Sequence, residues 1–425
     1  MPIWDGTHGY DTATLQSFRG CINPVGRDFP ARALERSRQI ELIERTFTAA
    51  CSAQRVRAPK QAFTRWIVDQ DHGGADPLIP SQPDFSQLEK ELANAGCTRA
   101  QFQVISDAMA GQCARSLEAI GLVPPESVGA QPACTRSEST NTIALAFMGS
   151  SLSVNSSHYE KLRALYLRCG GDYRVLDEAI FCLLSRYGIL NDVGFQAALH
   201  EGVFDTLRSE FGVMMECFAS PLNCRYGSYC SAFVDTDAPF GSVGSFFDFF
   251  PTVGSFEVNP PFTEPLMLRA ARHIDDVLSK SADLEPLSFC VFVPCWVGSD
   301  GWETMRSSSY LRRLMVIRQD CHGYVVGNQH AASRRHLPAT FHTGVFFLQN
   351  DKALQCWGPT VERVRRLTQA FEQSLPPLSS QDIARRDRIM REKKQRDIQN
   401  GWADAGKDDT GVAGIEEYVC PALRD

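Results

Sequence analysis

Four short apolar runs in the second half of the chain constrain the fold more than any other feature. They begin at Val213 (VMMECFAS), Gly254 (GSFEV), Leu287 (LSFCVFVP) and Thr343 (TGVFFLQN), and a helical pattern occupies residues 265–280 between the second and the third. Continuous apolar runs separated by helices predict a sheet that is covered on both faces. We therefore predict a doubly wound α/β domain, in which ligands bind at the carboxyl ends of the strands.

The first part of the chain follows a helical pattern instead. Apolar residues recur at helical spacing, and proline and glycine mark the stops. The pattern predicts helices over residues 31–47, from about Pro59, over 86–96 and over 99–120, and then a polar connector. After the connector we expect a hairpin over residues 143–154 that turns at Gly149-Ser150, and three helical stretches up to Phe211.

This change of pattern sets the expected domain boundaries. On a prior of ~150 residues per domain, a chain of 425 residues suggests two domains. We expect an all-helical domain over residues 1–140, the α/β domain over 141–375 and a charged tail over 376–425.

Composition limits the class of protein. The formal net charge of −7 argues against a general electrostatic coat for nucleic acid, although a local basic groove is compatible with it. The 15 cysteines are scattered singly, which favours free thiols in a reducing compartment. We found neither a signal-peptide pattern nor a run of the ~18 apolar residues that span a membrane, so no membrane association is expected.

The tail contains a basic stretch, RRDRIMREKKQR, at residues 385–396. It is a candidate RNA contact or nuclear localisation signal, and a solvated helix is the plainer interpretation. We expect the protein in the nucleus or the cytoplasm, with the nucleus favoured.

The tetrapeptide Asn259-Pro260-Pro261-Phe262 directly follows the second apolar run. Because proline gives a strand ladder no N–H, two prolines form a rigid strand exit that presents one amide and one ring at fixed positions. This motif suits methylation of an amine on an aromatic ring, whose nitrogen is a poor nucleophile. The Asn259 amide and the Pro260 carbonyl would accept its two hydrogens, and Phe262 would stack on the base. Such chemistry needs no metal.

A second motif, ECFASPLN at residues 216–223, follows the first apolar run. Small side chains at a strand end allow a ligand close to the backbone, as glycine does in nucleotide-binding folds. A plain turn from strand to loop is the alternative.

The runs FGVMMECFASPLNCRYGSYCSAFVDTDAPFGSVGSF, GSFEVNPPFTEPLM, LSFCVFVPCW and TGVFFLQND occur in this order, and together they closely resemble the phosphorylated-CTD-interacting-factor family. The similarity runs through most of residues 155–370, and QAFTRWIVD and ADPLIPS upstream resemble the helical domain of that family. The resemblance implies a Rossmann-like class I methyltransferase domain preceded by a helical domain. It also implies S-adenosylmethionine-dependent N6-methylation of the first transcribed, 2′-O-methylated adenosine next to the 7-methylguanosine cap, with S-adenosylhomocysteine as the second product.

The resemblance assigns roles to individual residues. It makes the Asn259 tetrapeptide the catalytic motif and implies a methyl-donor site at nine positions: Ala219, Ser220, Pro221, Asn223, Asp235, Asp237, Phe240, Gly241 and Ser242. The two aspartates would bind donor hydroxyls or the amino group, and solvated loop acids are an equal alternative. Glu257 would lie on the same face of its strand as Asn259 and position the substrate site.

Capped RNA, the expected partner, brings a triphosphate and a cationic purine, which call for basic side chains near aromatic rings. Arg65 is the candidate in the helical domain, and Arg27, Lys60, Arg312-Arg313, Arg334-Arg335, His330 and His336 are weaker ones. The cysteines at 217, 224 and 230 lack the spacing of a zinc site.

Two departures from the family leave alternatives open. The paired-tryptophan spacing of a WW domain is not found, so binding of the phosphorylated polymerase tail is in doubt, and Cys295 stands before Trp296 where an acidic residue is expected. The alternatives are an N6-adenine methyltransferase that acts on internal RNA adenines or on DNA, and a catalytically degenerate cap-binding protein.

Overall fold

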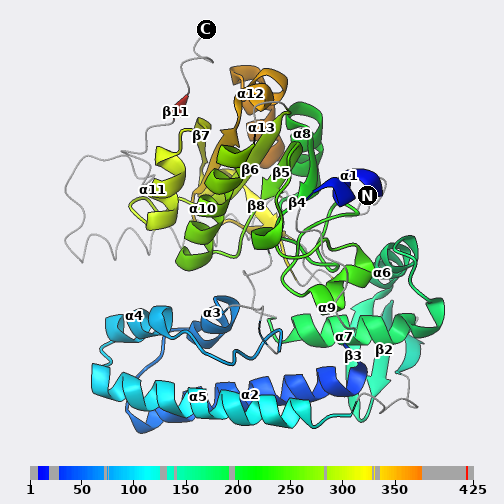
Figure 1. Cartoon of the computed structure of the whole chain (residues 1–425), viewed down its shortest axis with the longest axis vertical. Helices are drawn as coiled ribbons and strands as arrows, with labels where there is room; N and C mark the ends of the chain where they lie inside the picture. The colour runs from blue at the N-terminus through cyan, green and yellow to red at the C-terminus, as the bar shows by residue number, and fades with distance from the viewer. Residues whose placement is uncertain are drawn as a thin grey trace, which may run out of the picture.

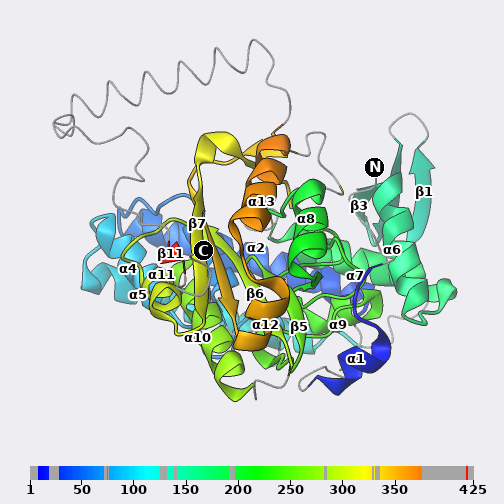
Figure 2. The same cartoon turned by 90° about the horizontal axis from the view of Figure 1, so that it is seen from above.

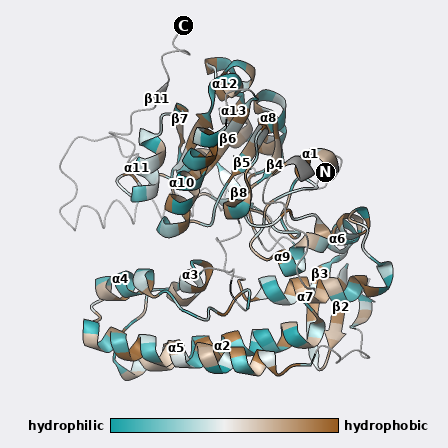
Figure 3. Ribbon diagram, viewed as in Figure 1, coloured by the Kyte–Doolittle hydropathy of each residue, from teal (hydrophilic) through white to brown (hydrophobic). Residues whose placement is uncertain are grey.

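The structure, a computed structural model, describes residues 8–18, 28–70, 74, 76–124, 132–137, 141–190, 197–281, 285–327, 330, 336–375 and 418–419. A layer of helices from the first part of the chain lies beneath a helix-covered sheet (Figure 1). The first helices are α1 (Thr12–Ser17), α2 (Pro30–Ala53), α3 (Ala62–Val68), α4 (Ser86–Asn94) and α5 (Arg99–Gly121). The predicted helices are thereby confirmed. Teal and brown alternate along α2 and α5, as expected of helices with one buried side (Figure 3).

The hairpin that follows these helices is confirmed, with its turn one residue earlier than predicted. Strands β2 (Thr142–Phe147) and β3 (Ser150–Asn155) pair antiparallel around Met148 and Gly149, whose φ angles are 46° and 80°. Two positive φ angles are typical of the tight turns that fit the strand twist. A third strand, β1 (Ala133–Ser137), pairs with β2 where a polar connector was expected. The range expected to be all-helical therefore ends in a strand.

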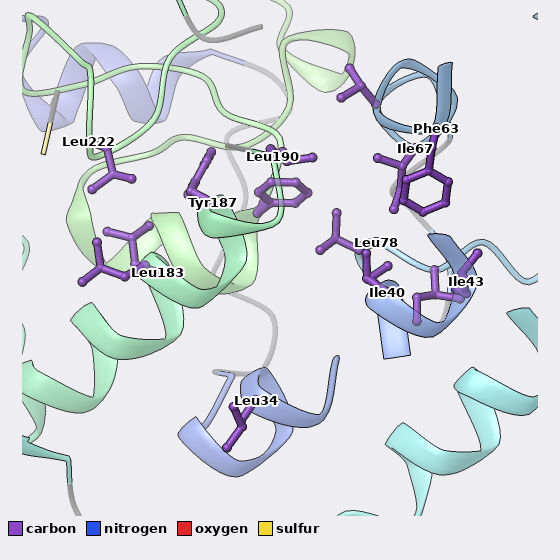
Figure 4. Close-up of a cluster of buried hydrophobic side chains, with 14 of the residues drawn as sticks. Leu34, Ile40, Ile43, Phe63, Ile67, Leu78, Leu183, Tyr187, Leu190 and Leu222 are labelled. Atoms are coloured by element: carbon purple, nitrogen blue, oxygen red, sulfur yellow. The ribbon is translucent and has the colours of Figure 1, made fainter. Parts of the chain in front are cut away.

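Helices α6 (Ser156–Arg168), α7 (Leu176–Gly188) and α8 (Glu201–Phe211) are the three predicted after the hairpin. In α7 every residue from Ala179 to Tyr187 is buried, so this helix is central. Side chains of α2, α3 and α7 and of the loop around Leu222 form one hydrophobic cluster (Figure 4). The helical layer and the loops near Leu222 thus share a core.

The main sheet has six strands in the order β11-β7-β10-β6-β5-β4. Its members are β4 (Val213–Glu216), β5 (Gly254–Val258), β6 (Leu287–Pro294), β7 (Leu311–Ile317), β10 (Thr343–Gln349) and β11 (Tyr418–Val419). The four predicted strands are among them. Strands β4, β5 and β6 are parallel, whereas β10 runs antiparallel to both of its neighbours, β6 and β7.

Helices cover both faces of this sheet (Figure 2). Phe289 and Phe346 pack with helices α10 (Glu264–Lys280) and α11 (Asp300–Ser307) on one face. Their chain neighbours, Cys290 and Phe347, pack with α8 and α13 (Val361–Gln373) on the other. Burial of successive residues on opposite faces explains why these strands read as continuous apolar runs.

The remaining elements are short. They are α9 (Val234–Asp237), α12 (Asp351–Trp357), the two-stranded sheet of β8 (Gly323–Val325) and β9 (His336–Pro338), and 3₁₀ turns at Tyr173–Val175, Ala238–Phe240, Phe246–Asp248 and Gln319–Cys321. None of the described helices combines the length and apolarity that a membrane crossing requires.

Candidate functional site at the carboxyl ends of β4 and β5

The two motifs singled out in the sequence leave the sheet side by side. Strands β4 and β5 are parallel neighbours in which Glu216 is paired with Glu257. The loops that follow the two strands therefore leave the sheet at the same edge. The Cys217 N–H donates to the Glu257 carbonyl over 2.8 Å and holds the loop after β4 against β5. The structure thus brings residues 217–223 and 259–262 to one edge.

Asn259 ends β5 with its side chain fixed and one oxygen unused. It is 8% exposed, and its Nδ2 donates to the Ala197 carbonyl over 3.0 Å. Its Oδ1 is enclosed and has no hydrogen-bond partner among the described residues. The bond to Ala197 sets the orientation of the amide, so the atom left over is the acceptor that the proposed chemistry requires.

Phe262 belongs to a group of three aromatic rings beside this amide. Its ring centroid lies 5.2 Å from that of Phe341 and 6.0 Å from that of Tyr324. These rings line a cavity of about 760 Å³ together with Trp296, a residue just after the end of β6. The cavity also reaches α3 and α4, so it lies between the helical layer and the sheet.

Charged groups of the cavity come from both sides. The described lining includes Arg65, Asp69 and Glu91 from the helical layer and Glu264 from the first turn of α10. Arg65 donates from Nε and Nη2 to the two Glu91 oxygens over 2.8 and 2.6 Å. Its guanidinium is therefore engaged within the helical layer and reaches a phosphate only if this pair opens.

The small-residue loop after β4 is closed by its own asparagine. Asn223 Oδ1 accepts from the Ser220 N–H over 2.7 Å and from the Ser220 hydroxyl over 3.0 Å. Pro221 is buried between them, and Ala219 is half-buried, with its N–H donated to the Cys230 carbonyl. The loop is a compact turn in which Ser220 and Asn223 bond to each other.

The two aspartates predicted for the donor are held by α7. Arg186 donates to Asp235 through Nη1 and Nη2 over 2.9 and 2.7 Å, and this ion pair keeps the pKa of Asp235 low despite its burial. Asp237 is fully buried and accepts from the Tyr187 hydroxyl over 2.6 Å, and burial raises its pKa to about 7. The interpretation of Asp237 as a solvated loop acid is therefore wrong.

The turn at residues 240–242 follows these two aspartates in the chain. Phe240 is fully buried, and its carbonyl accepts from the Tyr229 hydroxyl. Gly241 has a φ of 106°, and a Cβ there would lie 2.6 Å from the Gly227 carbonyl, so only glycine fits. The Ser242 hydroxyl lies 2.7 Å from that of Ser231. As with the small-residue loop, none of these residues lines the 760 Å³ cavity.

Glu257 faces another carboxyl group on the neighbouring strand. Burial raises the pKa of Glu216 to about 7, although its carboxylate accepts the N–H groups of Arg225 and Tyr226. Burial and the charge of Glu216 raise the pKa of Glu257 further above its usual range. The pair therefore holds a proton at neutral pH, with Glu257 as the protonated partner.

Among the weaker basic candidates, Arg312, Arg313 and His330 are not described residues of the cavity lining. Lys60 and His336 are next in sequence to the lining residues Gln61 and Leu337. Arg312 and Arg313 are in β7, where Arg312 is paired with Asp351 and Arg313 donates to the Pro359 carbonyl. His330 is buried, and burial lowers its pKa to about 4. Arg27, Arg334, Arg335 and the basic stretch at 385–396 lie outside the described residues.

Cys295 follows β6 directly, and its N–H donates to the His342 carbonyl over 2.9 Å. Burial raises the pKa of its thiol to about 12, so it is neutral at physiological pH. In the described ranges no three His, Cys, Asp or Glu side chains come together as metal ligands.

Several groups around the site were not predicted. Asp69, Tyr324 and Phe341 line the cavity, Ala197 orients Asn259, and Glu216 is paired with Glu257. Only Glu216 carried a local signal, because it is an acidic residue inside an apolar run that ends at the motif loop. The others come from segments far from the motif in sequence.

The structure is that of an α/β protein. Its buried parallel strands bring two loops to one sheet edge beside an aromatic cavity, which is where ligands bind in such folds. Residues 161–327 match the family model described as the WW domain of phosphorylated CTD interacting factor 1. This region, which contains both loops, is therefore similar to the phosphorylated-CTD-interacting-factor family.

Two curated relatives are both named mRNA (2′-O-methyladenosine-N(6)-)-methyltransferase. The mouse protein is 40% identical over 252 residues, and the human protein is 39% identical over the same length. Each match covers 55% of this chain and 35% of the relative. The chain thus spans about a third of the length of the curated relatives it matches.

Proposed function

We propose that this protein is an S-adenosylmethionine-dependent N6-methyltransferase that acts on the first transcribed, 2′-O-methylated adenosine of capped mRNA. The observation that carries the proposal is the oriented Asn259 amide, whose free Oδ1 lies at a strand end next to Phe262 and the aromatic cavity. The names of the mouse and human relatives support the same reaction.

The amide and the adjacent carbonyl prepare the amine. Asn259 Oδ1 accepts one N–H of the exocyclic amine of adenine, and the Pro260 carbonyl accepts the other. Both bonds draw the nitrogen toward a pyramidal geometry, which frees its lone pair from the ring. Phe262 stacks on the base and fixes its plane. The nitrogen gains a methyl group and then loses a proton to water, so no general base is needed.

The donor supplies an electrophilic methyl group on a sulfonium when it is bound. We assign it to the loop of Ser220 and Asn223, because the hydrogen bond from Cys217 to Glu257 places this loop beside the catalytic motif. The side chains of Ala219 and Ser220 are small, and the parallel strands end there. The antiparallel position of β10 between β6 and β7 supports the Rossmann-like methyltransferase fold that the resemblance implies.

The cavity next to Phe262 is assigned to the capped end of the RNA. Trp296, Tyr324 and Phe341 offer ring faces or edges to planar bases. Within the described ranges its charged lining consists of one arginine and three carboxylates, of which Glu91 is neutralised by Arg65. This charge balance favours a cationic base over a phosphate inside the cavity and puts the phosphates at its mouth.

The test is methyl transfer from a labelled donor to short RNAs that differ only in the cap and the first nucleotide. We expect transfer to the capped RNA that starts with 2′-O-methyladenosine, much less to its uncapped form and none when another base comes first. Equal transfer to capped and uncapped RNA would instead favour internal or DNA adenines. Cap binding without any transfer would favour a degenerate cap-binding protein.

Nuclear residence and binding of the phosphorylated polymerase tail are separate proposals. The name of the matching family model contains both the WW domain and the phosphorylated CTD, so tail binding deserves a direct measurement. Titration with tail peptides, phosphorylated and unphosphorylated, measures it, and imaging of the tagged chain in cells measures the location.

A further inference from the structure

Asp69 and Thr263 connect the helical layer to the residue that follows the catalytic motif. The Thr263 hydroxyl donates to Asp69 Oδ1 over 2.5 Å, although the two residues are 194 positions apart. Thr263 is 4% exposed and directly follows Phe262. Both residues line the 760 Å³ cavity, so the bond closes one side of it.

This contact replaces the usual local use of the threonine side chain. Thr263 is the N-cap residue of α10, where a threonine hydroxyl ordinarily accepts a backbone N–H of the first turn. Here the helix start has no side-chain cap hydrogen bond. The Thr263 N–H donates to the Pro261 carbonyl over 2.8 Å, and its carbonyl accepts the Met267 N–H of the first turn of α10. Only the hydroxyl turns away from the helix, and it joins the motif to Asp69 at the end of α3.

The carboxylate is fixed on the helical side. Asp69 caps the end of α3, whose Arg65 is in turn held by Glu91 of α4. Its Oδ2 is enclosed without a hydrogen-bond partner in the described part of the chain, so the bond from Thr263 is its main compensation for burial. A charged-acceptor hydrogen bond of this length is among the stronger ones that side chains make.

We propose that Asp69 is a positioning residue, which acts through Thr263 to hold Phe262 and the Asn259 amide in the geometry for methyl transfer. This inference rests on the proposed function of the motif. It gives the helical layer a second task besides contact with RNA, since it makes the layer a brace for the catalytic tetrapeptide. Loss of this brace should lower turnover, while the loop of Ser220 and Asn223 still binds the donor.

The test compares Asp69→Ala, Thr263→Val and the double variant in the full chain. We expect each single variant to lower kcat about tenfold to 100-fold, as small misplacements of reacting groups do. The double variant should be no worse than the poorer single one, because both changes remove the same bond. Binding of S-adenosylhomocysteine should stay within about twofold of wild type.

Two controls separate positioning from general stability. Thr263→Ser keeps the hydroxyl and should restore kcat to near wild type, whereas a role of the methyl group in packing would leave it impaired. Asp107→Ala removes an exposed carboxylate from α5 and should change nothing. An unchanged kcat in Thr263→Val, or losses that multiply in the double variant, would overturn the proposal.

A readout independent of activity covers the case in which the wild type transfers no methyl group. Hydrogen exchange of the Thr263 amide should be faster in Asp69→Ala than in the wild type, while amides of α5 stay unchanged. If exchange at Thr263 is the same in both proteins, the brace does not exist. If exchange changes but no RNA is methylated, the proposed function fails and the brace stands as a structural contact.

Discussion

Glu216 and Glu257 lie opposite each other on the parallel strands β4 and β5, and both are almost completely buried. Two carboxyl groups in such a place do not both ionise at neutral pH, because neither burial nor the like charge favours a second anion. Both carboxyl groups lie on the strands that lead into the two loops of the candidate site. This relationship makes the stability of the protein sensitive to pH.

The free energy of unfolding should fall between pH 6 and pH 8. The pKa values of Glu216 and Asp237 are about 7 in the folded protein, and ordinary carboxyl values apply after unfolding. A carboxyl group whose pKa is higher in the folded state than in the unfolded state stabilises the folded protein. This contribution is complete when the pH is below the unfolded-state pKa, and it is lost as the pH rises through about 7. Each group should account for roughly 1 kcal/mol of the fall. Urea unfolding at both pH values measures it.

Substitution identifies the groups responsible. Glu216→Gln or Asp237→Asn should reduce the fall between pH 6 and pH 8, since neither amide titrates. Glu362→Gln is the matched control, because exposed arginines lower the pKa of Glu362 to about 2 and leave no titration in this window. A wild-type free energy that rises from pH 6 to pH 8 would contradict the assignment.

Asn259→Ala should abolish methyl transfer and leave donor binding intact. The change removes one preorganised acceptor, which in comparable sites is worth about 3 kcal/mol or more of transition-state stabilisation. Single-turnover rates with capped RNA, compared with S-adenosylhomocysteine affinity, separate the two effects. Asn259→Asp is the informative companion, because the carboxylate cannot donate to the Ala197 carbonyl and the acceptor loses its orientation. Normal turnover in the alanine variant would refute the mechanism.

S-adenosylhomocysteine should raise the melting temperature of the wild type, because a ligand that binds only the folded state stabilises it by mass action. Ser220→Trp should eliminate this shift by filling the loop after β4, where Ser220 is 2% exposed. Since a tryptophan can also disturb the core, Asn223→Ala is the second variant. It removes the acceptor that closes the loop and should weaken donor binding with less effect on folding. A full shift in both variants would put the donor elsewhere.

Arg65→Ala should raise the KM for capped RNA more than it changes turnover on an uncapped oligonucleotide. The reason is that loss of a phosphate contact weakens binding that the ground state and the transition state share. Glu91→Gln distinguishes this role from a purely structural one. It weakens the hold on the Arg65 guanidinium, so it should lower the KM if Arg65 binds phosphate and raise it if the pair only fixes α3 to α4.

The sequence predicted the sheet well where burial on both faces left a continuous apolar run, as in β6 and β10. It missed β7, because Arg312 and Arg313 interrupt the run at its start. The arginines are tolerated since Arg312 reaches Asp351 and Arg313 reaches a backbone carbonyl. The antiparallel direction of β10 was also missed, because an apolar run does not encode strand direction.

The candidate site was predictable where the chemistry is local. Two prolines after an asparagine fix a strand exit regardless of the rest of the chain, and the position of Asn259 follows. The partners of the site depend on tertiary structure. Asp69 approaches Thr263, and Arg186 approaches Asp235, only because distant helices pack against the sheet, and no spacing in the sequence records this.

The hydrophobic cluster that joins α2 to Phe240 determines when this chain can fold during synthesis. Its members range from Leu34 to Phe240, so the cluster is incomplete until more than half of the chain has left the ribosome. Until then α2 and α5 lack part of the surface that buries their apolar side chains, and such exposed apolar surface favours aggregation. The loops assigned to the methyl donor complete the same cluster, so the helical layer and the donor site become native together.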